Sequence, residues 1–248
     1  MCVGGLLAKY DVWKNIQRRW KQVIDHENSL SKKAGHRIME RYHANTCANL
    51  KGDFREWSQQ RQIKFVKSLV AILGKYKPYI FANALSKQDY LDAYSHIPES
   101  QWKGRCYEAC MAACIADIGA WMQSHNLQNN DELHVFHESH DEFNTSAQNA
   151  LIGLRQSGAP YKNSVKEVTP LRWQDCIALQ PADFIAYETM KLAKQINAAE
   201  PVMKDGRVPL RKTITALMGL CVPAKGSLLK REYLLMLGER HRKRNHPE

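Results

Sequence analysis

The feature that most constrains the fold is an alternation between short apolar runs and long amphipathic segments. The runs "MCVGGLLA", "KPYIFANAL", "ELHVF" and "SVKEV" have the length and composition of β-strands. Between and after them, apolar residues recur with a helical period over residues 9–27, 53–76, 101–125, 145–156, 182–197 and 210–220. Strands separated by helices that can cover a sheet indicate an α/β fold. Because no linker or repeat divides the chain, we expect one domain over residues 1–224 and a basic tail over 225–248.

Two of the predicted helices carry an apolar stripe on one face and cations on another. The first stripe comprises Val12, Trp13, Ile16, Trp20, Val23 and Ile24, and the cations are Lys14, Arg18 and Lys21. The second helix is predicted to open on a capping box formed by Asp53 and Glu56. Its stripe comprises Ile63, Val66, Leu69, Val70 and Leu73, and its cations are Arg61, Lys64 and Lys67. The positions of Trp13, Trp20 and Trp57 near these stripes favour core packing over base stacking.

The net charge of +11 is distributed unevenly along the chain. Residues 1–77 hold 16 Lys+Arg and 6 Asp+Glu, residues 78–224 hold 13 and 16, and residues 225–248 hold 7 and 3. Such asymmetry indicates a polyanionic partner, although exposed lysines that only increase solubility would give the same composition. No stretch approaches the roughly 20 apolar residues of a membrane span, and no basic region precedes the apolar start as in a signal peptide. We therefore expect a cytoplasmic protein.

The seven cysteines show neither a CxxC pair nor a Cys/His ligand spacing. An odd number without such spacing argues against a disulfide framework or a zinc site. Cys106, Cys110 and Cys114 share one face of a predicted helix, where Ala109 and Ala113 lie beside them. A metal or redox site is conceivable at this spacing, but small packing residues are the favoured interpretation.

Carboxylates gather at two places where core elements end. Glu138 and Asp141 follow the predicted strand 133–137, and Asp183 begins the helix that comes directly after "CIALQ". Magnesium prefers such oxygen ligands, and two ions about 4 Å apart can stabilise an in-line displacement at phosphorus. Alternatively, Asp183 caps its own helix, a contribution of about 0.3–1 kcal/mol, and the acids at 138–142 lie in a solvated turn. The spacing alone leaves both interpretations open.

Three stretches of the sequence are similar to a known family. "VGGLLAKYDVWKNIQRRW", "RYHANTCANLKGDFREW" and above all "ALQPADFIAYETMK" resemble the bacterial domain-of-unknown-function family 3800, over Val3 to about Lys194. The resemblance implies a ribonuclease-H-like mixed sheet flanked by helices. It also implies that Asp183 is the acid of the family's Leu-Gln-x-Ala-Asp motif and that Glu138 and Asp141 are its strand-end acids. His43 matches the histidine of the Phe-His segment, and Asp175 is a supporting residue.

The family's first strand, which carries a leading acid, has no counterpart in this sequence. The resemblance implies that this strand supplies the central metal ligand. A start placed at an internal methionine, a shortened chain or a loss of activity would each explain the difference, and we favour a misplaced start.

Three functions follow from these observations. The first is a metal-dependent nuclease in which Glu138, Asp183 and Asp141 hold Mg²⁺ or Mn²⁺ and act in catalysis. The nucleic acid would be bound through its backbone, without sequence specificity, by Lys14, Arg18, Lys21, His43, Arg61, Lys64 and Lys67, with the tail at Arg240–Arg244. The second is a catalytically inactive nucleic-acid-binding or adaptor module of the same fold. The third is a structural protein whose charges only keep it in solution.

Overall fold

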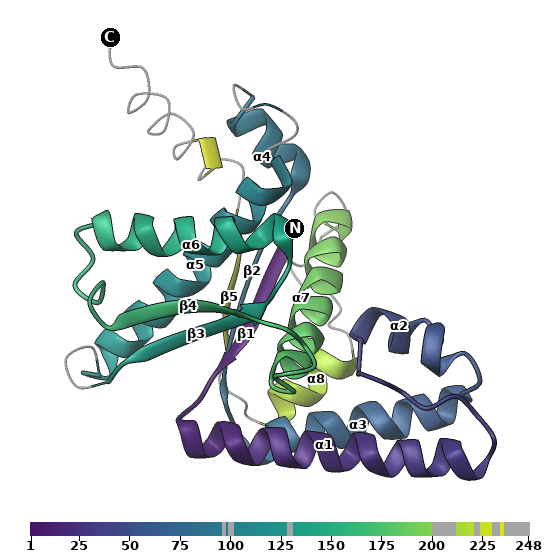
Figure 1. Cartoon of the computed structure of the whole chain (residues 1–248). Coiled ribbons are helices and arrows are strands. Elements are labelled where there is room, and N and C mark those ends of the chain that lie inside the picture. Colours follow the sequence, from purple (N-terminus) through teal and green to yellow (C-terminus); the bar gives the residue numbers. More distant parts are fainter. Residues whose placement is uncertain are drawn as a thin grey trace. The chain divides into compact units, whose positions relative to one another are not determined.

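The computed structural model describes residues 1–95, 98, 102–127, 131–199, 212–220, 224–229 and 234–235. The fold is mixed α/β, as the sequence predicts (Figure 1). The chain divides into two compact units, each assembled from separate stretches. Unit 1 comprises Met1–Val3, Phe81–Leu171 and Gly226–Glu248, and unit 2 comprises Gly4–Ile80 and Arg172–Lys225. The predicted single domain over residues 1–224 stays a prediction.

A three-stranded sheet has the strand order β1 (Cys2–Leu7), β2 (Tyr79–Leu85) and β5 (Ala224–Leu229). Met1 and Leu85 donate a backbone hydrogen bond to each other's carbonyl, at 3.1 and 3.0 Å. This exchange is the pattern of an antiparallel pair. The sequence predicted β1 and β2 but not β5, which lies at the start of the expected basic tail. Residues 240–244 of that tail lie outside the described residues.

Unit 1 contains helix α4 (Lys87–Ala93), helix α5 (Trp102–Ser124), strand β3 (Leu133–Glu138), helix α6 (Asp141–Gln156) and strand β4 (Val165–Leu171). β3 and β4 are parallel neighbours, with His134 opposite Glu167 and Glu138 opposite Leu171. α5 packs against α4 and α6, and α6 packs against β4. α6 begins at Asp141, so the predicted acidic turn is partly the first turn of a helix.

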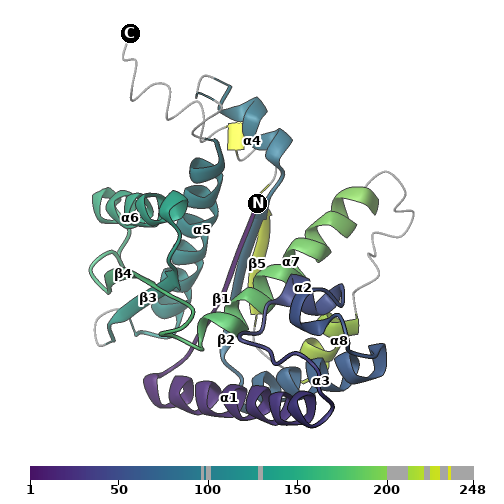
Figure 2. The ribbon, with the colours of Figure 1, turned by 45° about the vertical axis from the view of Figure 1, so that its right-hand side comes forward.

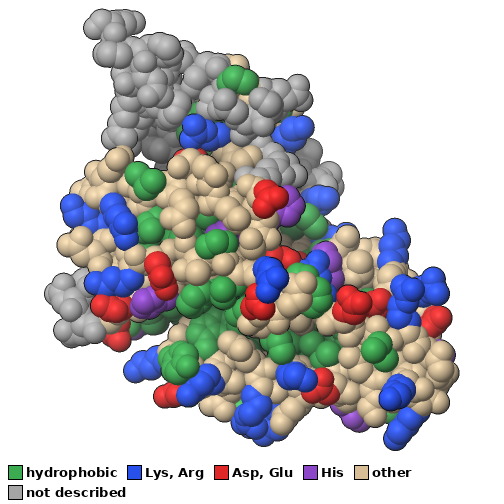
Figure 3. Space-filling model, viewed as in Figure 1, with side chains coloured by type: hydrophobic (Ala, Val, Ile, Leu, Met, Phe, Trp, Pro, Cys, Tyr) green, Lys and Arg blue, Asp and Glu red, His purple; other side chains and the backbone are tan. Residues whose placement is uncertain are grey.

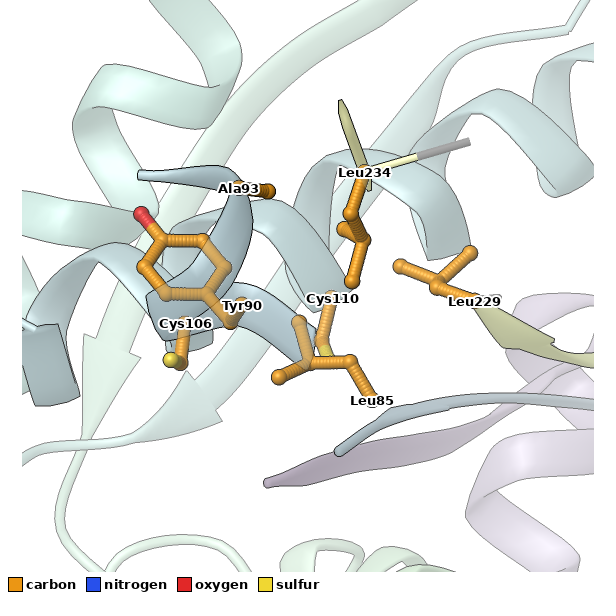
Figure 4. Close-up of a cluster of buried hydrophobic side chains, with 7 residues drawn as sticks. All are labelled: Leu85, Tyr90, Ala93, Cys106, Cys110, Leu229 and Leu234. Carbon is orange, nitrogen blue, oxygen red and sulfur yellow. The ribbon is translucent and has the colours of Figure 1, made fainter. Parts of the chain in front are cut away.

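The core of unit 1 includes two of the cysteines on α5. Cys106 and Cys110 are buried in a cluster formed by Leu85, Tyr90, Ala93, Leu229 and Leu234 (Figure 4). Cys114, one turn further along, is also buried. Small thiols let the helix approach its neighbours closely. The interpretation of these cysteines as packing residues is confirmed.

Unit 2 contains helix α1 (Tyr10–Lys33), helix α2 (Ala44–Ala48), the 3₁₀ turn η1 (Gly52–Phe54), helix α3 (Gln59–Tyr76), helix α7 (Leu179–Ala199) and helix α8 (Lys212–Gly219). α1 lies along α3, and α2 lies against α7 (Figures 1 and 2). The core is rich in aromatic contacts among Trp20, Tyr42, Phe54, Trp57, Phe65 and Phe184. The core positions predicted for Trp20 and Trp57 are confirmed.

The predicted start of α3 is wrong. The helix begins at Gln59, and its N-cap is Ser58, whose hydroxyl accepts a hydrogen bond from the Arg61 amide at 3.2 Å. Asp53, the predicted cap, lies in η1. The buried stripe differs in part from the predicted one, since Ile63 is 45% exposed while Phe65 is buried. The stripe consists of Phe65, Leu69, Val70, Ile72 and Leu73.

A glycine determines how closely β1 approaches α7 within unit 2. A Cβ atom added at Gly4 would lie 2.8 Å from the backbone nitrogen of Ala186 and 2.9 Å from its Cα. The same atom added at Gly5 would meet nothing within 4 Å. The first glycine of the "VGG" stretch is therefore required for packing, and the second is not.

Within the part of the chain that the structure describes, no helix combines the length and apolar character needed to cross a membrane.

Candidate functional site

Asp183 does not cap its own helix, so the predicted capping role is wrong. α7 begins at Leu179, which places Asp183 beyond the first turn, and that turn contains no acid. Its Oδ2 atom instead accepts a hydrogen bond from the backbone amide of Ala44, 139 residues away in the sequence, at 2.7 Å. The same oxygen lies 3.3 Å from Nδ1 of His43. The carboxylate therefore joins α7 to the start of α2.

Gln180, one turn before Asp183, makes a parallel contact. Its Oε1 atom accepts a hydrogen bond from the amide of Tyr42 at 3.2 Å. His43, which lies between Tyr42 and Ala44 in the sequence, is extended, with φ −129° and ψ 116°. Helix positions i and i+3 share a face at a spacing of about 5–6 Å. We call this pair of contacts the Gln180–Asp183 clasp.

The clasp lies at the edge of the aromatic core of unit 2. Tyr42 is 3% exposed, and burial is the main reason why its pKa lies well above the usual value for tyrosine. The charges of Cys47, Asp183 and Glu188 raise this pKa further. The side chains of His43 and Asp183 remain 41% and 33% exposed. The clasp therefore has a buried inner side at Tyr42 and Gln180, whereas the side chains of its Asp–His contact are partly exposed.

Glu138 and Asp141 both belong to unit 1, whereas Asp183 belongs to unit 2. Glu138 is the last residue of β3 and Asp141 the first of α6, and both are exposed. Carboxylates suit Mg²⁺ or Mn²⁺, but across the described ranges no group of three or more His, Cys, Asp or Glu side chains could hold a metal ion. The predicted metal centre formed by the three acids stays a prediction.

The predicted nucleic-acid-binding cations differ in their surroundings. Lys14 and Lys21 pair with Asp11 and Asp25 on the same helix, at 3.3 and 2.7 Å, and remain more than half exposed. Arg18 is exposed and donates to Asn15, and Lys64 and Lys67 are exposed on α3. Figure 3 shows Lys and Arg side chains along α1, with acidic side chains between them. Surface pairs of this kind contribute at most about 1 kcal/mol, so a polyanion can compete for these cations.

Arg61 is held inside unit 2. Its Nε donates to Glu27 at 2.9 Å, and its Nη2 donates to Ser31 and to the carbonyl of Glu27, each at 2.9 Å. Its guanidinium carbon lies 4.0 Å from the ring centre of Trp57. The Arg61 and Glu27 side chains are only 19% and 11% exposed. Arg61 therefore has a structural role, and we leave it out of the proposed nucleic-acid surface.

Sequence reasoning missed three polar features. Gln180 lies inside the "LQPADF" stretch but received no role. Asn83 is an amide in the apolar run "YIFANAL"; it is 1% exposed and donates to Asp117 at 2.9 Å, while its Oδ1 has no hydrogen-bond partner. An asparagine side chain in a central strand needs a hydrogen-bond partner, and this was the signal in the sequence that could have indicated the Asn83–Asp117 contact. The third feature is a contact between Arg41 and Trp173, with the guanidinium carbon 5.1 Å from the ring centre.

Asp175 has a local partner rather than a place in the clasp. It accepts hydrogen bonds from Nε and Nη2 of Arg172, at 2.8 and 3.4 Å, and this pair raises the pKa of Arg172. The predicted supporting role of Asp175 stays a prediction.

Together these features define a two-unit α/β protein with an Asp–His contact on a basic unit. Comparison with protein-family models, with curated proteins and with solved structures finds no match. The resemblance to family 3800 therefore stays a prediction, and the proposals below are built on the contacts just described.

Proposed function

We propose that the protein is a metal-dependent nuclease with a ribonuclease-H-like fold, acting on phosphodiester bonds of RNA or DNA. Asp183, beside His43 in unit 2, would take part in holding Mg²⁺ or Mn²⁺, and the metal-binding roles of Glu138 and Asp141 stay predictions. The ion would activate the attacking water and stabilise the leaving oxygen. The α/β class agrees with such a fold at the level of its elements, with an antiparallel β1–β2 pair in one sheet and a parallel β3–β4 pair in a second sheet.

The observation that carries the proposal is the contact between Asp183 and His43. The family resemblance suggested both residues independently, from stretches far apart in the sequence. In the structure they lie 3.3 Å apart, and both side chains are partly exposed. A solvent-facing acid with a histidine beside it can bind a cation or position a proton.

Other groups in unit 2 support binding of the substrate. The clasp fixes the backbone on both sides of His43, which limits the directions its imidazole can take. Lys14, Arg18, Lys21, Lys64 and Lys67 would attract the phosphate backbone without reading base sequence.

A second candidate is a module that binds nucleic acid without cleaving it. The observation that favours it is the lack, throughout the described ranges, of a group of three or more metal-ligating side chains. In that case the Asp183–Ala44 hydrogen bond would be the whole role of Asp183.

The two candidates are separated by Asp183→Asn. Asparagine keeps an oxygen that can accept the Ala44 amide, so the clasp is retained while the negative charge is lost. We expect the unmodified protein to cut labelled RNA or DNA with Mg²⁺ or Mn²⁺ and not with a chelator. The variant should lose cleavage while keeping nucleic-acid binding and the same unfolding midpoint.

Gln180→Ala is the matched control. It removes the contact to the Tyr42 amide without changing charge, so any loss of cleavage caused by a loosened clasp would appear there as well. If Asp183→Asn cuts as fast as the unmodified protein, Asp183 is structural only. If the unmodified protein retards nucleic acid in a gel but does not cut it, the second candidate is correct.

A further inference from the structure

Two arginine–tryptophan stacks occur among the described residues of unit 2, in very different surroundings. Trp57 is 5% exposed, and the Arg61 guanidinium above it donates hydrogen bonds to Glu27 and Ser31. Trp173 and Arg41, by contrast, are both half-buried, so part of each side chain reaches solvent. The first stack belongs to the core, whereas the second lies at the surface.

The surface stack adjoins the clasp. Arg41 directly precedes Tyr42, whose amide donates to Gln180. Trp173 lies in the turn before α7, the helix that carries Gln180 and Asp183. Consecutive Cα atoms are about 3.8 Å apart, so Arg41 is held close to the clasp by the chain itself.

The stack also has a strongly exposed cation beside it. Arg172 precedes Trp173, and its side chain is 72% exposed in its pair with Asp175. An exposed pair of this kind contributes little to stability, about 0–1 kcal/mol. A phosphate can therefore displace Asp175 from Arg172 without disturbing the fold of unit 2.

We propose that Arg41, Trp173 and Arg172 form a binding site for single-stranded nucleic acid, in which an unpaired base stacks on the indole or on the guanidinium of Arg41. Arg172 binds the adjoining phosphate. Flat aromatic and guanidinium surfaces accept any unpaired base, whereas bases in a duplex are already stacked on each other. The site rests on the proposed function because it would deliver a single strand to the Asp183–His43 contact.

The test measures binding of a labelled, unstructured oligonucleotide by fluorescence anisotropy. A metal chelator is present, so that no cleavage occurs. Trp173→Ala should weaken single-strand binding about tenfold, since stacking contributes about 1–3 kcal/mol per base. The slope of log K against log salt should not change, because indole carries no charge. Trp173→Phe keeps an aromatic face and should restore most of the affinity, which separates stacking from misfolding.

A second variant tests the cation. Arg172→Ala should weaken binding and reduce the salt slope by about one phosphate contact. Lys64→Ala, which removes an exposed cation from α3, is the matched control, and it should weaken single-strand and duplex binding equally. The affinity of Trp173→Ala for duplex should lie within about twofold of that of the unmodified protein, a difference that we count as no effect.

Each outcome decides between the proposals. If Trp173→Ala binds a single strand as tightly as the unmodified protein, or loses duplex affinity equally, the stacking site is wrong, whatever the result for cleavage. If no metal ion supports cleavage but Trp173→Ala weakens single-strand binding, the stacking site stands and the nuclease proposal fails. If the unmodified protein binds no nucleic acid, both fail.

Discussion

The two units differ first in charge. Unit 2 holds 24 Lys+Arg and 11 Asp+Glu, a net charge of +13, whereas unit 1 holds 12 and 14, a net charge of −2. The positive excess of the whole protein therefore belongs to unit 2. A surface that attracts a polyanion is expected on that unit, which also contains the Asp183–His43 contact and the Arg41–Trp173 stack.

The units also differ in what joins their elements. In unit 2, polar side chains from one helix reach the backbone or charge of a distant segment, as Gln180, Asp183 and Arg61 do. In unit 1, α5 packs through buried thiols and a cluster of apolar side chains, and its Asp117 also accepts a hydrogen bond from Asn83 of β2. The comparison teaches that high charge and internal order coexist in unit 2 because some of its charged residues are used as structural contacts.

The largest effect is expected from Arg61→Ala, which tests whether the internal charges of unit 2 are structural. Removing the guanidinium leaves the Glu27 carboxylate buried and unpaired, so we expect a loss of about 3 kcal/mol in the free energy of unfolding. Urea unfolding followed by tryptophan fluorescence measures the loss. Lys64→Ala, one turn along α3 and exposed, should change stability by less than about 0.5 kcal/mol. Equal losses of stability in the two variants would contradict the distinction between a structural Arg61 and an exposed Lys64.

The next largest loss of stability is expected from Gly4→Ala, because the substitution forces β1 away from α7 in unit 2. The added methyl group meets helix backbone, which cannot move aside as a flexible side chain can. We expect a loss of about 2 kcal/mol, measured by the same urea titration. Gly5→Ala adds the same methyl group where nothing lies within 4 Å. A stable Gly4→Ala would show that the close approach is not required.

Charge reversal tests the assignment of polyanion binding to unit 2. Lys64→Glu combined with Lys67→Glu should weaken single-strand binding about tenfold and reduce the salt slope by about 0.7 per lost phosphate contact. Lys87→Glu combined with Lys162→Glu makes the same change of charge in unit 1 and should have a clearly smaller effect. Similar losses for both pairs would mean that net charge, rather than its location, governs binding.

The smallest effect is expected when thiol reagents are added, because the buried cysteines of unit 1 should react slowly. Burial raises the pKa of Cys106 and Cys114 to about 11. Thiolate is the reactive form, so at mildly alkaline pH both should be modified slowly, and faster as the pH rises toward 11. Cys176 of unit 2 is half-buried and should react first. Peptide mapping by mass spectrometry measures the order, and rapid modification of Cys106 would show that unit 1 opens readily.

Strands β1 and β2 and the approximate positions of the long helices could be predicted because periodicity is a local property of the chain. The start of α3 was missed since Ser58 competes with Asp53 as a cap, and only the backbone conformation decides between them. β5 was missed because its sequence, "AKGSLL", lacks the alternation of a half-buried strand. For Asp183, the sequence identified the residue but not its partners, which lie 139 residues away.

By itself, the sequence determined the α/β class, the long amphipathic helices and the excess of positive charge at one end of the chain. These follow from the spacing of neighbouring residues, and backbone geometry converts that spacing directly into elements. Only the tertiary structure decided that Arg61 faces Glu27, that Asp183 binds the Ala44 amide, and that two separate stretches combine in the basic unit. Packing brings such residues together, and no local pattern records which distant groups will meet.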